Sequence, residues 1–315
     1  MTEALDTNKA DRLGAVKKGI AYVALITTAM GLSASAEDIK PNFGDDFVMV
    51  AVGDSILSGT TEQSSREFFD CQSDQISSID IAARNMGVKA ITAACYGSSI
   101  PDMAIGRFNQ PSQYDSLDEN ADVVLMSAGA NAVNLSELVD ICLDGSCDYD
   151  DPEITDALNT VNSDELKEDM KQAHQKIAEQ APNAHIIQYQ YYEIIEENSF
   201  CGLALNVWAG KNISGLVDNY ITTLNETIES AVNESKEDGI PIDILPPTRN
   251  MEPCDSGFTT LYLDFLNSPR SFGHPTPRGH ELIADNLQRR LASLSIDWGR
   301  EKTHNELAEA QTGGK

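Results

Sequence analysis

The stretch of sequence that decides the fold is residues 46–55, which read DFVMVAVGDS. Residues 47–52 form a short, continuous apolar run rich in β-branched side chains, which is typical of a strand buried on both faces of a parallel sheet. The run ends at Gly53, and Asp54 and Ser55 follow directly. Because sites in such sheets lie at the carboxyl ends of strands, Ser55 is the first candidate functional residue.

Further strands and helices are predicted to alternate along the chain. Strands are predicted at residues 88–94, 122–127, 185–192 and 240–245. Helices are predicted over residues 75–86, 163–180, 213–236 and 277–294. Ser163 and Thr276 are the expected N-caps of two of these helices. The alternation predicts an α/β fold, a three-layer α/β/α sandwich around a mostly parallel five-stranded sheet.

Residues 1–36 have the pattern of a secretory signal peptide. Basic residues precede an apolar run over residues 19–32, and the small-residue sequence Ala-Ser-Ala ends at Ala36. The run is shorter than the roughly 20 residues that a membrane-spanning helix needs. We therefore expect cleavage near Ala36, secretion without stable membrane insertion, one domain over residues 37–298 and a polar tail over residues 299–315.

The cysteines agree with an exported protein. All six lie beyond the expected cleavage site, at Cys71, Cys95, Cys142, Cys147, Cys201 and Cys254. An even number in an oxidising compartment suggests three disulfides, for which fifteen pairings are possible. We favour the sequential pairing of Cys71 with Cys95, Cys142 with Cys147, and Cys201 with Cys254. A zinc site is the weaker alternative, because no CxxC pair or neighbouring histidine has ligand spacing, and we expect neither metal nor cofactor.

The charge of the chain excludes one class of partner. The formal net charge is −28 at pH 7, and removing the four cations and three acids of residues 1–36 takes away +1 and leaves −29. Such an acidic surface repels phosphate backbones, so we expect no nucleic acid partner. It also opposes adsorption to anionic lipid.

Three other short motifs stand where a site in this fold would draw its residues. They are Cys95-Tyr96-Gly97 after the second strand, Gly129-Ala130-Asn131 after the third, and Phe272-Gly273-His274-Pro275 before the last helix. Taken alone, Asp54 and Ser55 could belong to an ordinary strand-to-loop turn, and His274 could be a loop histidine beside a helix cap. Four motifs in one consistent order favour a functional site.

This set of motifs resembles the SGNH, or GDSL, hydrolase family over about residues 46–294. The resemblance implies the flavodoxin-like SGNH fold and hydrolysis of carboxylic esters by a serine. By matching position, Ser55 would be the nucleophile and His274 the general base. The oxyanion hole would consist of the Ser55 amide, the Gly97 amide and the Asn131 side chain. Imidazole suits proton transfer near neutral pH, and preorganised donors stabilise the tetrahedral intermediate.

The sequence departs from the family pattern at two positions. Where the family often has an Asp three residues before its His, this chain has Ser271, and the acid that often follows the Asn is replaced by Ala132. The resemblance to secreted members with three disulfides implies a Ser-His dyad oriented by a backbone carbonyl. Asp255 and Asp264 remain alternative acids.

Two further side chains are expected to have structural rather than catalytic roles. We expect Asp54 to bond backbone around the nucleophile rather than to act as an acid, and His280 to pack inside the last helix or to bond backbone.

The predicted function is that of a secreted, monomeric esterase or lipase, which includes the phospholipases. Aromatic residues make up only 6% of the chain, which favours lipid or short acyl ester substrates over extended sugars. The alternatives are a carbohydrate acetyl esterase and a non-catalytic secreted binding protein of the same fold.

Overall fold

The computed structural model describes residues 46–61, 71, 77–133, 135, 138, 141–142, 148–249, 251, 273–294 and 296. All of them belong to one compact unit, Lys40–Lys315, and a separate unit comprises Met1–Ile39. The expected signal peptide and polar tail lie outside the described residues and stay predictions.

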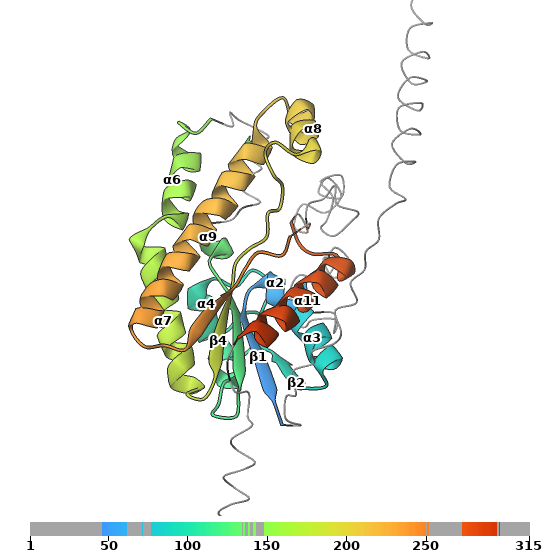
Figure 1. The fold of residues 1–315 in the computed structure, drawn as a ribbon. Coiled ribbons are helices and arrows are strands. Elements are labelled where there is room, and N and C mark those ends of the chain that lie inside the picture. Colours follow the sequence, from blue (N-terminus) through green and yellow to red (C-terminus); the bar gives the residue numbers. More distant parts are fainter. Residues whose placement is uncertain are drawn as a thin grey trace, which may run out of the picture. The chain divides into compact units, whose positions relative to one another are not determined.

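Five parallel strands form the central sheet (Figure 1). They are β1 (Val48–Gly53), β2 (Lys89–Thr92), β3 (Val123–Ser127), β4 (His185–Tyr189) and β5 (Ile242–Leu245). Their order across the sheet is β2-β1-β3-β4-β5, and every neighbouring pair runs parallel. The predicted parallel five-stranded α/β fold is confirmed, in the strand order of flavodoxin-like proteins.

The helices described are α2 (Ser55–Ser58), α3 (Ser78–Met86), α4 (Ile100–Ile105), α6 (Pro152–Val161), α7 (Asp164–Gln180), α8 (Phe200–Ala209), α9 (Ile213–Glu237) and α11 (Pro277–Ser293), with short 3-10 turns η2 (Gln113–Ser116) and η3 (Ala130–Ala132). Four of the helices that flank the sheet, α3, α7, α9 and α11, are those that the sequence predicts. Figure 1 shows α7 and α9 on one face of the sheet and α3 and α11 on the other, and the helices of each pair contact one another. The result is the expected three-layer arrangement.

The central strands owe their burial to their composition. Met49, Val50, Ala51 and Val52 of β1 are all buried, and every residue of β3 is buried as well. Continuous apolar strands of this kind are stable only when helices cover both faces of the sheet. The sheet therefore fixes where β1 ends and where the chain turns into α2.

Three of the predicted strands are two or three residues too long, those that correspond to β2, β4 and β5, and several helices are missing from the prediction. The fourth strand stops at Tyr189, because the backbone N–H and C=O of Tyr191 bond the Asn225 side chain of α9 at 2.8 and 2.7 Å instead of a neighbouring strand. The second strand likewise covers only β2. Helices α2, α4, α6 and α8 were not predicted. Helix α6 begins in an acidic stretch, where Asp151 caps it.

Helix α11 is joined to the segment that follows α2. Its N-cap, Thr276, accepts a hydrogen bond from Gly279 N, as the sequence predicts. His280 is buried in the helix, and its Nε2 lies 3.1 Å from the Thr60 carbonyl oxygen. The expectation that His280 packs and bonds backbone is confirmed.

One disulfide links two described cysteines, Cys71 and Cys95, as the sequential pairing predicts. Cys142 and Cys201 are also disulfide-bonded, whereas Cys147 and Cys254 lie outside the described residues, so those two pairings stay predictions. Among the helices described, none combines the length and apolar content that crossing a bilayer requires.

The buried His280 predicts a pH dependence of stability. Burial lowers the pKa of His280 from 6.5 to about 4, although the bond to Thr60 partly opposes the shift. The unfolded chain therefore takes up a proton below pH 6.5 that the folded chain refuses until about pH 4, so stability falls as the pH falls through this window. Between pH 7 and pH 5 the histidine should cost about 2 kcal/mol of unfolding free energy.

We expect His280→Gln, which retains a donor for the Thr60 carbonyl, to lose less stability than the parent between these two pH values. Urea unfolding of both proteins at pH 7 and pH 5 measures the difference. Other titrating groups are common to both chains, so an equal loss in the two proteins would contradict the assignment.

Candidate active site

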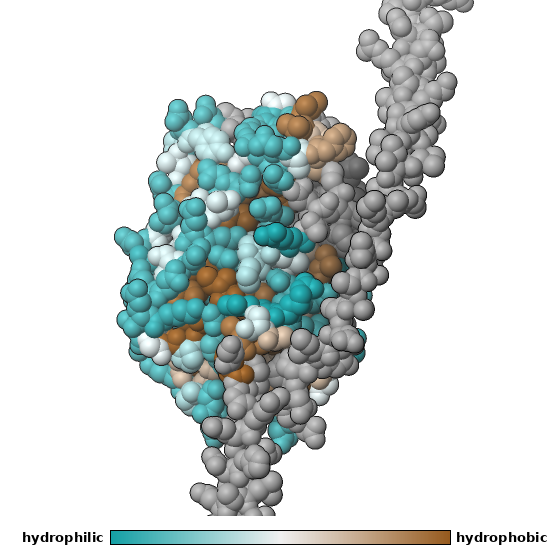
Figure 2. All heavy atoms as spheres, viewed as in Figure 1, coloured by the Kyte–Doolittle hydropathy of each residue, from teal (hydrophilic) through white to brown (hydrophobic). Residues whose placement is uncertain are grey.

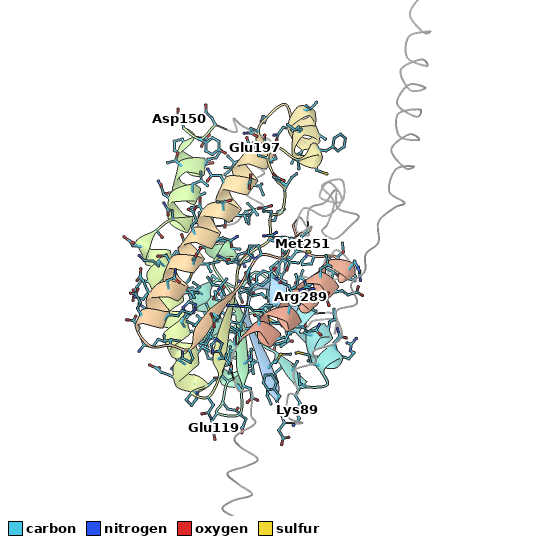
Figure 3. The ribbon with its side chains drawn as sticks, in the orientation of Figure 1. Lys89, Glu119, Asp150, Glu197, Met251 and Arg289 are labelled. Atoms are coloured by element: carbon cyan, nitrogen blue, oxygen red, sulfur yellow. A yellow bond between two sulfur atoms is a disulfide. The ribbon has the colours of Figure 1, made fainter. Side chains whose placement is uncertain are left out.

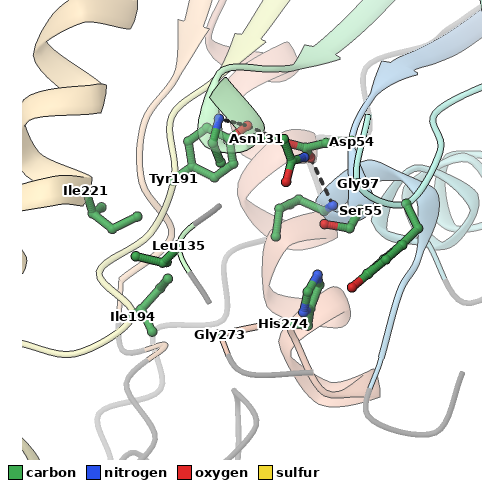
Figure 4. Close-up of a pocket in the computed structure, with 13 residues that line it drawn as sticks. Asp54, Ser55, Gly97, Asn131, Leu135, Tyr191, Ile194, Ile221, Gly273 and His274 are labelled. Carbon is green, nitrogen blue, oxygen red and sulfur yellow. Dashed lines mark hydrogen bonds between the residues drawn. The ribbon is translucent and has the colours of Figure 1, made fainter. Parts of the chain in front are cut away.

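A pocket of about 120 Å³ lies where β1 and β3 end, and it contains the predicted site residues (Figure 4). Ser55, Gly97, Asn131 and His274 all line it. They come from four separate segments of the chain, three of which follow a strand and one of which precedes α11. The structure therefore brings together the four residues that the sequence singled out.

Ser55 is presented by a sharp turn at the end of β1. Gly53 has φ +117°, and a Cβ there would lie 1.8 Å from the Ser127 carbonyl oxygen, so only glycine fits. Asp54 then caps the short helix α2 by accepting a bond from Ile56 N. Ser55 is the first residue of that helix, where a backbone N–H has no partner inside the helix.

Asp54 is the most buried charged group of the site. It is 1% exposed. Its Oδ1 accepts bonds from Ile56 N at 3.1 Å and from Ser127 Oγ at 2.8 Å, and its Oδ2 accepts one from the Tyr191 hydroxyl. Burial raises the pKa of Asp54 from 3.8 to about 6, while these three donors oppose the rise. The expectation that Asp54 bonds backbone near Ser55 is confirmed, and two side chains join it.

Tyr191 is a site residue that sequence reasoning missed. Besides donating to Asp54, its hydroxyl accepts a bond from Ala130 N at 3.4 Å, and its side chain lines the pocket. Tyr220 of α9 donates to the Ala130 carbonyl at 2.7 Å. Tyr191 therefore links the segment that carries Asn131 to the segment that carries Ser55, and Tyr220 ties the Asn131 segment to α9. In the sequence, Tyr191 is one of several tyrosines at the end of a predicted strand, and nothing there predicts its bonds to Asp54 and Ala130.

Gln113 is a second missed residue. It is buried, and its side-chain amide bonds both backbone groups of Gly53, as Oε1 accepts from the N–H and Nε2 donates to the C=O. Nε2 also lies 3.0 Å from Ser98 Oγ. One side chain thus joins the end of β1 to the loop that follows Gly97, and a lone Gln in the sequence does not predict this.

The loop that carries Gly97 is compact and charged. Gly97 has φ +67°, and a Cβ there would lie 3.1 Å from Nη2 of Arg107. Arg107 in turn forms an ion pair with Asp102 at 3.3 Å, and Asp102 closes the capping box of α4 with Ser99. An alanine at position 97 would be both strained and crowded.

The Asn131 side chain is already oriented. Its Nδ2 donates a bond to the Ser98 carbonyl at 3.0 Å. An asparagine amide carries two N–H donors, so this bond fixes the amide and still leaves one donor for a ligand in the pocket.

His274 stands directly before the capped helix α11. Gly273 has φ +76°, and its carbonyl accepts a bond from the Tyr192 hydroxyl. The imidazole lies 5.8 Å from the Tyr96 ring, measured between centroids, and Figure 4 shows it facing Ser55. Position 271 and the alternative acids Asp255 and Asp264 lie outside the described residues.

The rest of the pocket is apolar. Leu135, Ile194 and Ile221 line it opposite the polar residues (Figure 4). The site can therefore place an apolar group beside a hydroxyl, an imidazole and several N–H donors.

Comparison with known proteins identifies the family of the chain. The family model of GDSL-like lipases and acylhydrolases matches residues 49–287. The chain belongs to this family. No curated protein matches the chain.

Two solved structures resemble this GDSL-family chain in fold. Phospholipase A1 from Streptomyces albidoflavus is 19% identical with a TM-score of 0.60, and the match covers 77% of this chain and 99% of that one. An extracellular lipase from Streptomyces rimosus is 17% identical with a TM-score of 0.55, and the match covers 78% of this chain and all of the other. At these identities the likeness concerns the fold.

Tyr191 makes a testable contribution to this GDSL-family site. In Tyr191→Phe, the buried Asp54 loses a donor, so its pKa should rise further above the unfolded value of 3.8. A carboxyl whose pKa is raised by folding costs stability as the pH rises through the shifted range. We therefore expect Tyr191→Phe to lower the unfolding free energy by about 1–3 kcal/mol at pH 8, and by less at pH 5.

Chemical unfolding at pH 5 and pH 8 measures this difference. Tyr114→Phe is the matched control, because it removes the hydroxyl of another buried tyrosine, one that does not bond Asp54. If the effect of Tyr191→Phe were independent of pH, Tyr191 would not be supporting the charge on Asp54.

Proposed function

We propose that this protein is a secreted carboxylic-ester hydrolase that forms an acyl-enzyme on Ser55, with His274 as its general base. The observation that carries the proposal is the convergence of Ser55, Gly97, Asn131 and His274 on one pocket. The hydroxyl, the imidazole and the amide donors in one place form the set that acyl transfer needs.

The reaction begins at the Ser55 hydroxyl. As Oγ attacks the ester carbonyl carbon, the His274 imidazole accepts the hydroxyl proton. The carbonyl oxygen becomes an oxyanion, which the backbone N–H groups of Ser55 and Gly97 and the side-chain amide of Asn131 stabilise. The imidazolium then gives its proton to the leaving alcohol. In the second half of the reaction, His274 accepts a proton from water as the water attacks the acyl-enzyme. The imidazolium then returns a proton to Ser55 Oγ, and the acid is released.

The donors of this oxyanion hole are fixed before substrate arrives. Gln113 bonds the backbone of Gly53, two residues before Ser55, and the Tyr191 hydroxyl bonds the backbone N–H of Ala130, directly before Asn131. The Ser98 carbonyl holds the Asn131 amide. A preorganised donor costs no rearrangement in the transition state, which is why it lowers the barrier. The proposal needs no catalytic aspartate, because a backbone carbonyl would orient His274, as the resemblance to secreted three-disulfide members implies.

The substrate is a lipid or short acyl ester. The apolar side of the pocket, formed by Leu135, Ile194 and Ile221, suits the hydrocarbon of an acyl group. The net charge of −28 disfavours anionic substrates.

Secretion is part of the proposal. The Cys71–Cys95 disulfide suits an oxidising compartment, and residues 1–36 have the signal-peptide pattern described above. Cleavage near Ala36 would release a monomer with three disulfides.

Hydrolysis of a chain-length series of p-nitrophenyl esters by residues 37–315 tests this function. Ser55→Ala and His274→Ala should each lower turnover at least about a thousandfold, because the nucleophile or its base is gone. The preferred chain length separates an acetyl esterase from a lipase. A folded, disulfide-intact protein with no turnover above Ser55→Ala would contradict the proposal and favour a binding role.

Asn131 has a separate prediction. Asn131→Ala should lower kcat about a hundredfold or more, because one oxyanion donor is lost while the nucleophile and base remain. Steady-state kinetics on the best ester measures it, with the exposed Asn120→Ala as control. Equal kcat in the two variants would remove Asn131 from the oxyanion hole.

A further inference from the structure

Helix α8 has an apolar side that faces solvent. Its sequence, FCGLALNVWA, contains no charged residue. Phe200, Leu203 and Val207 are 84%, 53% and 83% exposed. At about 100° per residue these three positions fall within an arc of about 60° on one side of the helix. Figure 2 shows hydrophobic atoms gathered at this end of the unit.

The opposite side of α8 is the one that packs. Leu205 is only 4% exposed, and a Cβ on the buried Gly202 would lie 2.2 Å from the Glu196 carbonyl oxygen. Asn206 donates bonds to Asn212 and Ser214 at 2.8 and 2.7 Å. The helix is therefore anchored on its inner side, and its outer apolar side chains are not needed for packing.

The apolar side of α8 differs from the other exposed hydrophobic residues described. Ile91, Ile105 and Tyr149 each lie singly on other segments, which is normal for a protein surface. Three exposed apolar side chains on one side of a helix without charge form a patch, and such patches mark interaction sites.

The patch and the pocket lie on neighbouring stretches of the chain. Ile194, which lines the pocket, precedes the N-cap of α8, Ser199, by only a few residues. Figure 1 shows α8 on the side of the sheet where the strands end and Ser55 follows β1. A surface that binds α8 would therefore lie on the same side of the protein as the pocket.

The acidic residues near α8 determine which kind of lipid surface the patch can bind. Glu193, Glu196 and Glu197 precede α8, and Figure 3 shows Glu197 beside this end of the protein. Together with the net charge of −28, these carboxylates repel an anionic membrane. An apolar helix side inserts readily into the interface of a neutral or zwitterionic lipid layer.

We propose that Phe200, Leu203 and Val207 dock the enzyme on a neutral or zwitterionic lipid surface. The docking would bring lipid esters to the pocket; that purpose rests on the proposed ester-hydrolase function, whereas the docking itself does not. Insertion of these side chains removes apolar area from water, which supplies the attraction.

Co-sedimentation with phosphatidylcholine vesicles tests the docking without catalysis. The protein used is residues 37–315 carrying Ser55→Ala, so that the vesicles stay intact and the apolar run of residues 19–32 is absent. We expect it to bind, and we expect the further changes Phe200→Gln and Val207→Gln to weaken binding at least about tenfold. Glutamine preserves helix propensity, so α8 should remain folded.

The matched control replaces Ile91 and Ile105 by Gln, which removes two exposed apolar side chains elsewhere. This control should bind as the parent does. Vesicles rich in phosphatidylglycerol should bind the parent less well. Absence of binding by the parent, equal binding by the α8 variant, or a dimer by gel filtration that the α8 changes dissociate would each overturn the docking proposal.

A second measurement separates this proposal from the proposed function. In the chain with Ser55 restored, the α8 variant should hydrolyse a soluble short-chain ester within about twofold of the parent, but lose activity on esters dispersed with phosphatidylcholine in proportion to its binding. Vesicle binding without any ester turnover would contradict only the hydrolase. Turnover without vesicle binding would contradict only the docking.

Discussion

The structure of the site depends on the burial of one carboxylate. Asp54 lies between the end of β1 and the start of α2, where Ile56, Ser127 and Tyr191 all donate bonds to it. Burying such a charge is costly unless donors surround it, so each donor must come to a defined place. The donors belong to α2, to β3 and to the segment after β4. Their convergence on Asp54 is what places Ser55 and Asn131 at one pocket.

The chemistry and the packing of this region are thus one network. Tyr191 bonds both Asp54 and the backbone beside Asn131, and Gln113 bonds the backbone before Asp54 and the loop after Gly97. Neither side chain is needed for an acyl transfer step as such. In the proposed mechanism they would hold the oxyanion donors and the nucleophile at fixed separations, which is the condition for oxyanion stabilisation.

The sequence predicts those parts of the molecule that depend on local chemistry. The apolar run of β1 predicts a buried strand, and the caps Ser163 and Thr276 mark the starts of α7 and α11. The four motifs indicate the pocket because strand ends meet at one edge of a parallel sheet.

The parts that were missed depend on distant partners. The residues near Tyr191 and Gln113 in the sequence do not predict a bond to a residue far along the chain. Strand β4 ends earlier than predicted because the Asn225 side chain of α9 bonds the backbone that would continue it. Helix α8 was missed because its apolar residues lie on both sides, so it lacks the polar face by which a surface helix is recognised. Packing explains the apolar residues on the inner side of α8 but not those on its outer side.

The central claim is that Ser55 is a nucleophile activated by its surroundings, and covalent labelling tests it most directly. A fluorophosphonate, which loses fluoride as a serine oxygen bonds its phosphorus, would be incubated with the folded protein, and the adduct would be located by peptide mass spectrometry. The account predicts a single adduct on Ser55 that is absent after unfolding in urea and nearly absent in His274→Ala. Labelling of another serine, or none on a folded protein, would contradict it.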